Sequence, residues 1–316
     1  MPNRHLIVVA VGGNSLIRDE AHRTVQDQWA LTRETCHHLA HIIEAGHNVV
    51  ITHGNGPQVG FILRRSELAR HELHEVPLDS CGADTQGAIG YMIQQSLANE
   101  FRRRGMNRMA VTVVTQVVVA GDSPAFTHPS KPIGSFMDEA TARERAAQNG
   151  WTIAETPGHG WRRVVPSPEP IDIVELAAIR HLVEEGYVVT AVGGGGIPVV
   201  RDPSGDLRGV EAVIDKDLAS SLLARRLGAD LFVISTSVRK VSVNFERPDE
   251  RALDSMTLEE VRRYLAEGCF GAGTMAPKIR GVIDFLEAGG RQAIITCPSD
   301  LEDAIAGTAG TIIAAG

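Results

Sequence analysis

Residues 209–235 read GVEAVIDKDLASSLLARRLGADLFVIS and join a charged tripeptide, a helical pattern and an apolar strand. A helix over 217–227 is predicted by apolar residues that recur on one face: Leu218, Leu222, Leu223 and Leu227. The tripeptide Asp215-Lys216-Asp217 then stands at the start of this helix, where an aspartate caps free N–H groups and anions bind readily. A lysine held between two carboxylates suits gripping a phosphoryl group, although a capped helix with a surface salt bridge explains the tripeptide equally well when it is taken alone.

The same alternation of strand and helix continues along the chain. Strands are expected at LIVVAV (6–11), NVVIT (48–52), MAVTVVTQVVV (109–119), YVVTAV (187–192), LFVIS (231–235) and AIIT (293–296). Helices are expected across 24–45, 84–104, 172–185, 217–227 and 277–289. This order is typical of an α/β fold with a mainly parallel sheet and helices on both faces.

One segment, 121–170, interrupts the pattern. It is rich in proline and glycine and carries two of the three tryptophans. A structureless loop of that length is unusual, so we expect a small inserted subdomain or lid.

Composition narrows the class of protein. The 316 residues are 43% hydrophobic and 22% charged, and the net charge of −8 argues against nucleic acid as the main partner. The first apolar run is too short for a signal peptide, and no stretch reaches the roughly 20 apolar residues of a membrane span. The four cysteines are scattered without a CxxC pair, which favours reduced thiols and a cytoplasmic location. A zinc site at Cys36-His37-His38 is disfavoured, because consecutive helical residues point in different directions.

Four glycine-rich turns stand at strand ends or helix starts: Gly12-Gly13-Asn14-Ser15, His53-Gly54-Asn55-Gly56, Gly193–Gly196 and Gly271-Ala272-Gly273-Thr274. Each can be a tight connection, but together they favour backbone N–H groups converging on an anion. HGNGPQVG has the wrong spacing and place for a dinucleotide site, and no GxxxxGK[ST] or GxSxG motif occurs.

Lysine is scarce, with only Lys131, Lys216, Lys240 and Lys278 in the chain. Lys131 lies between two prolines in HPSKPIG, and Lys278 follows Pro277 at an expected helix start. Each could be an ordinary surface lysine. Taken together, Lys131, Lys216 and Lys278, which lie next to glycine- or proline-rich segments, are typical of charges that contact phosphate oxygens.

The chain resembles the carbamate kinases of the amino acid kinase family from residue 7 to about residue 315. The motifs that carry the resemblance are AVGGNSL (10–16), THGNGPQVG (52–60), PLDSCGADTQGAIGYM (77–92), DSPAFTHPSKPIG (122–134), GWRRVVPSPEP (160–170), GGGGIPVV (193–200), GVEAVIDKDLAS (209–220) and GTMAPK (273–278). GWRRVVPSP and EAVIDKDLAS are the most specific. Many other amino acid kinases have a lysine where this chain has Ala10, whereas carbamate kinases use one from the protruding subdomain, here Lys131.

The resemblance implies an open αβα sandwich, formed by a single amino acid kinase domain over 1–316, and a homodimer. Residues 1–210 would mainly bind carbamate and 211–316 nucleotide, with 121–170 as the protruding subdomain. The implied reaction is ATP + carbamate ⇌ ADP + carbamoyl phosphate with Mg²⁺, running toward ATP in arginine or other carbamoyl catabolism. No protein ligand for the metal is implied, because Mg²⁺ would be held mainly by the nucleotide phosphates.

Site residues follow from the same resemblance. The phosphoryl oxygens would be contacted by Lys131, Lys216 and Lys278. Asp217 would orient these lysines. Carbamoyl phosphate would be held by Gly12, Gly13, Asn14, Gly54, Asn55, Gly195 and Gly196. The nucleotide would lie against Asp215, Thr236, Ser237, Val238, Val241, Met275 and Pro277. Asp215 is alternatively no more than a cap.

Two departures from the family pattern are visible. Ser237 replaces the aspartate of the common T-D-V sequence, which bears on nucleotide preference, and Asp84 adds a charge that the pattern does not explain. Two other functions stay open on the residues alone. They are a kinase of another small carboxylic acid and a non-catalytic nucleotide-binding regulator.

Overall fold

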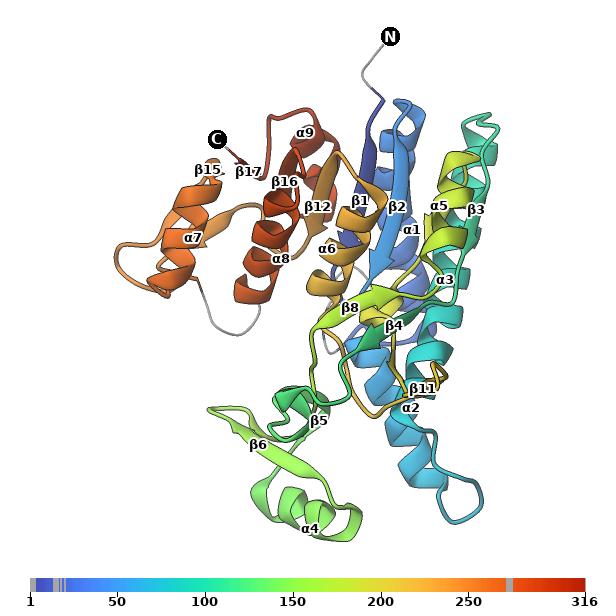
Figure 1. Ribbon diagram of the computed structural model, residues 1–316, viewed down its shortest axis with the longest axis vertical. Helices are drawn as coiled ribbons and strands as arrows, with labels where there is room; N and C mark the ends of the chain where they lie inside the picture. Colours follow the sequence, from blue (N-terminus) through green and yellow to red (C-terminus); the bar gives the residue numbers. More distant parts are fainter. Residues whose placement is uncertain (1–3, 14–16, 18, 20, 271–274, 316) are drawn as a thin grey trace.

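The computed structural model describes residues 4–13, 17, 19, 21–270 and 275–315. Its main body is built on an eight-stranded sheet (Figure 1). In spatial order the strands are β15 (Ser255–Thr257), β17 (Thr311–Ala314), β16 (Gln292–Thr296), β12 (Leu231–Ser235), β1 (Leu6–Val11), β2 (Asn48–His53), β9 (Val188–Thr190) and β3 (Ala110–Thr112). Neighbours pair in parallel except β16 and β17.

Helices cover both faces of this sheet. Along β1, Ile7 and Val9 pack on one side with helices α1 (Val25–Glu44), α3 (Leu78–Arg103) and α9 (Leu301–Ile305). Val8 and Ala10 pack on the other side with α5 (Leu176–Glu184), α6 (Lys216–Leu227), α7 (Leu258–Ala266) and α8 (Met275–Glu287). Alternate residues of one strand therefore enter two separate cores, which confirms the expected αβα sandwich.

A second sheet corrects one expectation from the sequence. The run 109–119 does not form one strand, because β3 ends at Thr112 and β4 (Gln116–Val119) belongs to a four-stranded sheet with β8 (Pro170–Ile173), β10 (Ile197–Arg201) and β11 (Leu207–Gly209). The chain is redirected at Thr115, whose backbone N donates to Oε1 of buried Gln86 at 2.7 Å. The helix expected over 172–185 likewise begins only at Leu176, since 170–173 is strand β8.

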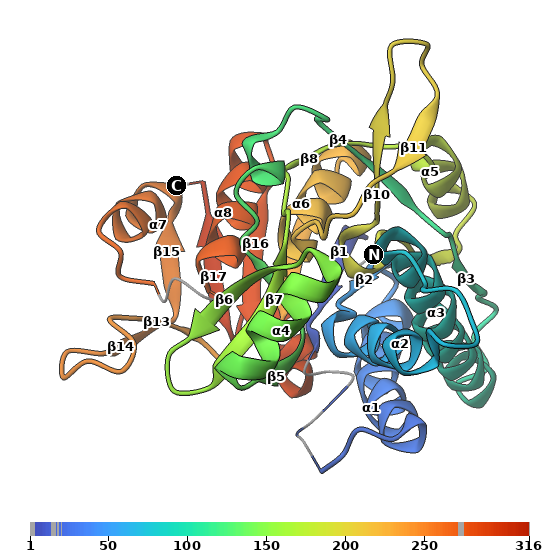
Figure 2. The ribbon, with the colours of Figure 1, turned by 90° about the horizontal axis from the view of Figure 1, so that it is seen from below.

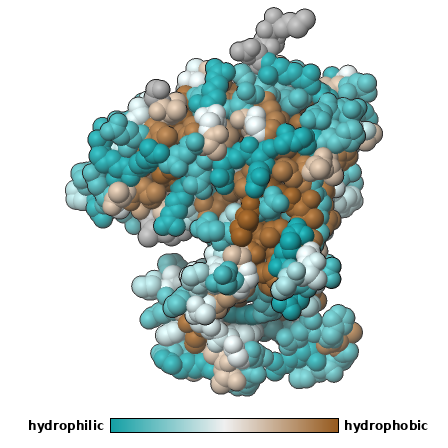
Figure 3. Space-filling model, in the orientation of Figure 1, coloured by the Kyte–Doolittle hydropathy of each residue, from teal (hydrophilic) through white to brown (hydrophobic). Residues whose placement is uncertain are grey.

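The expected insertion contains a compact unit of its own. Strands β5 (Lys131–Met137), β7 (Gly160–Val165) and β6 (Thr152–Thr156) form an antiparallel sheet with helix α4 (Glu139–Asn149). This unit, the protruding subdomain, lies below the main body in Figure 1 and in front of it in Figure 2. Most of its visible surface is hydrophilic (Figure 3).

The remaining described elements connect these parts. They are α2 (Gly56–Ala69), the hairpin β13 (Val241–Val243) and β14 (Arg251–Leu253), and the 3₁₀ turns η2 (Pro124–Phe126), η3 (Gly193–Gly195) and η4 (Pro298–Asp300). Among the described helices, none has the length and apolar character needed to cross a bilayer.

Candidate active site

A cavity of about 370 Å³ lies where the carboxyl ends of β1 and β2, the η3 turn and the start of α6 meet the protruding subdomain. In parallel α/β sheets, ligands bind at this edge. The residues expected from the sequence that line the cavity are Gly13, Gly54, Asn55, Lys131, Gly196, Asp215, Lys216, Asp217, Pro277 and Lys278. Residues from distant parts of the chain are thus brought into one cleft.

Asp217 holds two of the lysines. Its Oδ1 accepts from Nζ of Lys216 at 2.5 Å, and its Oδ2 accepts from Nζ of Lys278 at 2.9 Å. The side chain of Asp217 is 5% exposed. Burial alone would raise the pKa of Asp217, but the two ammonium groups and their hydrogen bonds lower it to about 2. Asp217 therefore stays ionised and fixes the spacing of both charges.

Asp215 connects the subdomain with the main body. It is the N-cap of α6, with Oδ1 accepting from the backbone N of Asp217 at 2.9 Å. Its Oδ2 accepts from Nζ of Lys131, the first residue of β5, at 2.6 Å. Asp215 is therefore more than a cap, since it also places the subdomain's lysine at the mouth of the cleft.

Arg162 was missed as a site residue by the sequence reasoning. It lines both this cavity and an adjoining one of about 600 Å³, and its guanidinium carbon lies 5.0 Å from the ring centroid of Phe136. Its Nε is buried without a hydrogen-bond partner among the described residues, and burial lowers the pKa of Arg162. The arginine pair in GWRRVV could have indicated this residue, because neighbouring side chains on a strand point to opposite sides. Arg162 faces the cleft, whereas Arg163 points away from it and pairs with Glu211.

The glycine turns approach each other too closely for side chains. A Cβ on Gly54 would lie 3.2 Å from the backbone N of Gly13 and 3.6 Å from Cδ of Lys216. Gly194 has a φ of +69°, and a Cβ there would lie 2.1 Å from Nδ2 of Asn55. Gly194 therefore requires glycine through both its φ and this close contact, whereas a Cβ at Gly54 would press only slightly on the backbone of Gly13.

Helix α3 supports these turns through residues that sequence reasoning did not select. Nε2 of Gln86 donates to the carbonyls of Gly193 at 3.0 Å and Thr115 at 3.1 Å. Nδ2 of Asn55 donates to Oγ1 of Thr85 at 2.8 Å. Both α3 side chains are 1% exposed, so the sequence DTQG supplies a buried scaffold for the cleft.

Of the expected nucleotide residues, Asp215 and Pro277 line the cleft, whereas the others follow β12 or begin α8. Thr236 follows β12, and its backbone N donates to the carbonyl of Thr296 at 2.8 Å, while Ser237 is exposed and Val238 partly buried. Val241 is fully buried in the core, so its side chain supports this segment from inside. Met275 begins α8.

Several expected residues do not line the 370 Å³ cavity: Gly12, Gly195, Thr236, Ser237, Val238, Val241 and Met275. Gly12 nevertheless anchors the first turn, since its backbone N donates to the carbonyl of Ser235 at 2.9 Å. Asn14 and the turn 271–274 lie outside the described residues.

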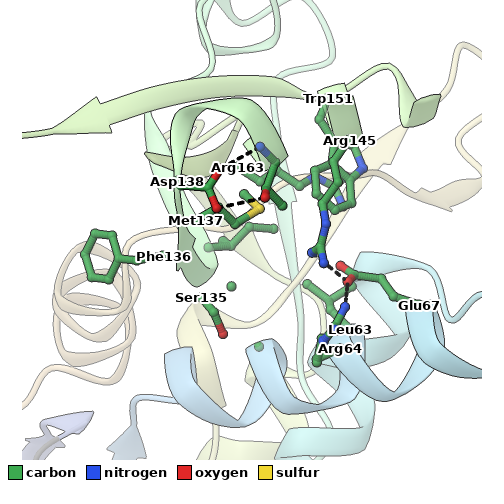
Figure 4. A pocket seen from close by; sticks show the side chains of 14 residues that line it. Leu63, Arg64, Glu67, Ser135, Phe136, Met137, Asp138, Arg145, Trp151 and Arg163 are labelled. Atoms are coloured by element: carbon green, nitrogen blue, oxygen red, sulfur yellow. Dashed lines mark hydrogen bonds and ion pairs between the residues drawn. The ribbon is translucent and has the colours of Figure 1, made fainter. Parts of the chain in front are cut away.

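A further cavity of about 330 Å³ separates α2 from the subdomain (Figure 4). Glu67 of α2 bridges it, accepting from Arg145 of α4 at 3.2 Å and from Arg64 at 3.0 Å. Arg70 of the α2 end donates to Asn149 at 3.2 Å. These contacts link α4 to α2 across the cavity.

Comparison with known proteins agrees with this geometry. The family model described as the amino acid kinase family matches residues 5–297. The chain belongs to the amino acid kinase family. Within this family it is 48% identical to the carbamate kinase-like protein YahI of Escherichia coli, covering 98% of this chain and 99% of the relative.

Other members of the amino acid kinase family match equally fully. Carbamate kinase of Thermococcus kodakarensis is 46% identical over 96% of this chain and 98% of its own. The structure of carbamate kinase from Giardia lamblia bound to AMP-PNP superposes with a TM-score of 0.92 at 41% identity, covering 99% of both chains.

Proposed function

We propose that this protein is a carbamate kinase, catalysing ATP + carbamate ⇌ ADP + carbamoyl phosphate. The observation that carries the proposal is the cleft in which Lys131, Lys216 and Lys278 meet through two aspartates. Full-length similarity to carbamate kinases supports the choice of acceptor. We place the physiological direction toward ATP, in arginine or other carbamoyl catabolism.

Charge placement accounts for how this cleft would act. Phosphoryl transfer passes through a loose, anionic transition state, so catalysis rests on positioning and charge stabilisation. The cleft is lined by four positively charged side chains, the three lysines and Arg162, and by two aspartates. Its net charge is therefore positive, which favours the phosphoryl oxygens. Carbamate is already an anion and needs no general base. The only histidine beside the cleft glycines among the described residues, His53, is buried, and burial lowers its pKa to about 4.

ATP and ADP are the proposed nucleotide substrates, with Mg²⁺ as the accompanying ion. The described residues include no group of three or more His, Cys, Asp or Glu able to hold a metal. The cleft carboxylates Asp215 and Asp217 are already engaged by lysines. The described residues of the cleft therefore offer no metal cage, and Mg²⁺ would be brought by the nucleotide phosphates.

The segment 121–170 is proposed to act as a lid. Lys131 enters the cleft from the subdomain, so movement of this unit would add or remove one charge at the phosphoryl group. Hydrogen exchange measured with and without ADP and carbamoyl phosphate tests this. Increased protection within 121–170 is expected, and unchanged exchange there would contradict a lid.

A homodimer is proposed as the working assembly. Strand β3 is an edge of the large sheet. Three exposed apolar side chains lie on or beside it: Tyr91 (58% exposed), Met109 (60%) and Val114 (52%). Sedimentation equilibrium should give twice the chain mass, and Met109→Lys should weaken association.

We also place the protein in the cytoplasm, supported by four free cysteines.

A coupled assay for ATP formed from ADP and carbamoyl phosphate tests the function. Turnover with carbamoyl phosphate but not with acetyl or glutamyl phosphate is expected. Turnover only with another acyl phosphate would identify a kinase of a different small acid. No ADP phosphorylation with any of them would favour a nucleotide-binding regulator.

A further inference from the structure

A pair of histidines lies on α1, away from the active-site cleft. His37 and His41 are one helical turn apart, and their Nε2 atoms face each other at 3.4 Å. Their side chains are 53% and 37% exposed, so solvent reaches the space beside them. The sequence had directed attention to Cys36-His37-His38, but Cys36 is fully buried and donates to the carbonyl of Ile93.

The far side of each imidazole faces a carboxylate. Nδ1 of His37 lies 3.3 Å from Oε2 of Glu100, and Nδ1 of His41 lies 3.7 Å from Oε2 of Glu302. A carboxylate beside Nδ1 favours the tautomer that keeps a hydrogen there, which makes Nε2 the nitrogen available to a metal. The two Nε2 atoms lie within hydrogen-bond distance of each other, so a cation bound by both would take the place of that hydrogen bond.

The separation of the two nitrogens suits one metal ion. With a metal–nitrogen distance of about 2.0–2.1 Å, tetrahedral ligands lie about 3.3–3.4 Å apart. Imidazole is a ligand for zinc, copper and nickel, and carboxylates behind metal-bound histidines orient the rings and raise their basicity. The observed 3.4 Å meets the first condition, and Glu100 meets the second at hydrogen-bond distance from His37, while Glu302 lies at ion-pair distance from His41.

We propose that His37 and His41 form a two-histidine site for a divalent transition metal such as Zn²⁺, with Glu100 and Glu302 as its outer carboxylates. Water completes the coordination, since no third protein ligand is placed there among the described residues. The site differs from the magnesium requirement of the kinase reaction in its ligands and its place.

The neighbouring charges allow such a cation. Nη2 of Arg104 also lies 3.3 Å from Nδ1 of His37, and the charge of this guanidinium is offset by two glutamates: Nη1 donates to Glu44 at 2.5 Å and Nε donates to Glu100 at 3.1 Å. Arg103 pairs with the other oxygen of Glu100 at 2.5 Å. Three glutamates therefore outnumber two arginines around the histidines.

Binding would hold the end of α1 rather than act on the reaction. Helix α1 runs from the cleft edge to the opposite edge of the sheet, where β2 begins (Figure 1). Its last turns meet the end of α3 through Glu100 and α9 through Glu302. A metal across one turn would resist fraying there, and because it would bind the folded pair more tightly than the unfolded chain it would raise the melting temperature.

Titration calorimetry with Zn²⁺ alone, in a non-chelating buffer, tests the site. One Zn²⁺ per chain is expected, with affinity reduced at least tenfold in His37→Ala and His41→Ala and about tenfold in Glu302→Gln. His71→Ala removes an exposed histidine elsewhere and should bind as the unmodified protein does. No uptake by the unmodified protein, or equal affinity in His41→Ala, would overturn the proposal.

A second readout guards against variants that misfold. Zn²⁺ should raise the melting temperature of the unmodified protein and of His71→Ala, but not of His41→Ala or His41→Gln. The kinase turnover of these variants without zinc reports whether they are folded, since the pair lies outside the catalytic cleft. A zinc-dependent shift that survives in folded His41→Gln would refute the pair as ligands.

Discussion

Nζ of Lys278 lies 2.9 Å from Oδ2 of Asp217, although 61 residues separate them in the chain. The other oxygen of the same carboxylate binds Lys216 at 2.5 Å. One buried aspartate thus fixes two ammonium groups that come from the starts of different helices, α6 and α8. This arrangement keeps both charges in place before substrate arrives, which is how electrostatic catalysis avoids reorganisation.

Replacing Lys216 should affect turnover more than binding. Lys216→Ala removes a charge proposed to act on the phosphoryl group in the transition state. The activation free energy should therefore rise by about 3 kcal/mol, so that kcat falls roughly 10²-fold, with a smaller change in KM. Steady-state kinetics in the ATP-forming direction measure this. Arg262→Ala is the control, because Arg262 is an exposed cation that pairs with Glu287 outside the cleft and the nucleotide segment. Near-normal turnover of Lys216→Ala would exclude the assigned role.

The charge of Asp217, rather than its shape, should be required. Asp217→Asn keeps the side-chain volume but leaves two ammonium groups repelling each other, so we expect kcat to fall roughly 10²-fold. Asp254→Asn removes the partner of Lys240 and should leave kinetics unchanged. If Asp217→Asn retained full kcat, the lysines would have to be positioned by other contacts.

Gln86 should act on the cleft through the Gly193 turn. Gln86→Leu leaves the backbone N of Thr115 without its partner, at a cost of about 1–3 kcal/mol for this buried group. It also removes one of the two hydrogen bonds to the carbonyl of Gly193, which still accepts from the backbone N of Gly196. Stability should fall, and KM for carbamoyl phosphate should rise about tenfold because the turn is no longer fixed. Gln94→Leu, an exposed change on the same helix, is the control. An unchanged KM in a destabilised Gln86→Leu would mean that Gln86 serves stability alone.

His53 should make stability depend on pH. Burial lowers the pKa of His53 from 6.5 to about 4, so between these values the unfolded chain binds a proton that the folded chain does not. Stability is then fully present above pH 6.5 and falls as the pH drops to 4, by roughly 3 kcal/mol. Urea unfolding from pH 7 to 4 measures this slope. The slope should flatten in His53→Gln, and an identical slope would assign the effect to other groups.

Much of the architecture was readable in the chain. Apolar runs such as LIVVAV and LFVIS became β1 and β12, and the leucine pattern after Asp217 became α6. Such patterns are local, because one face of a helix or strand must be apolar to be buried. The prediction of a single strand over 109–119 was wrong for the same reason, because the apolar character of this run suits two strands as well as one. The break between the strands depends on Gln86 of helix α3, which is distant in the chain.

The sequence by itself determined the alternating α/β order, the glycine turns and the scarcity of lysine, since these are properties of residue type and spacing. Tertiary structure alone decided which charges meet. Lys131 reaches Asp215 across 84 residues, Arg162 turns into the cleft while Arg163 pairs with Glu211, and Gln86 holds a turn far along the chain. Such pairings depend on how the sheets and the subdomain pack, and no local periodicity encodes them.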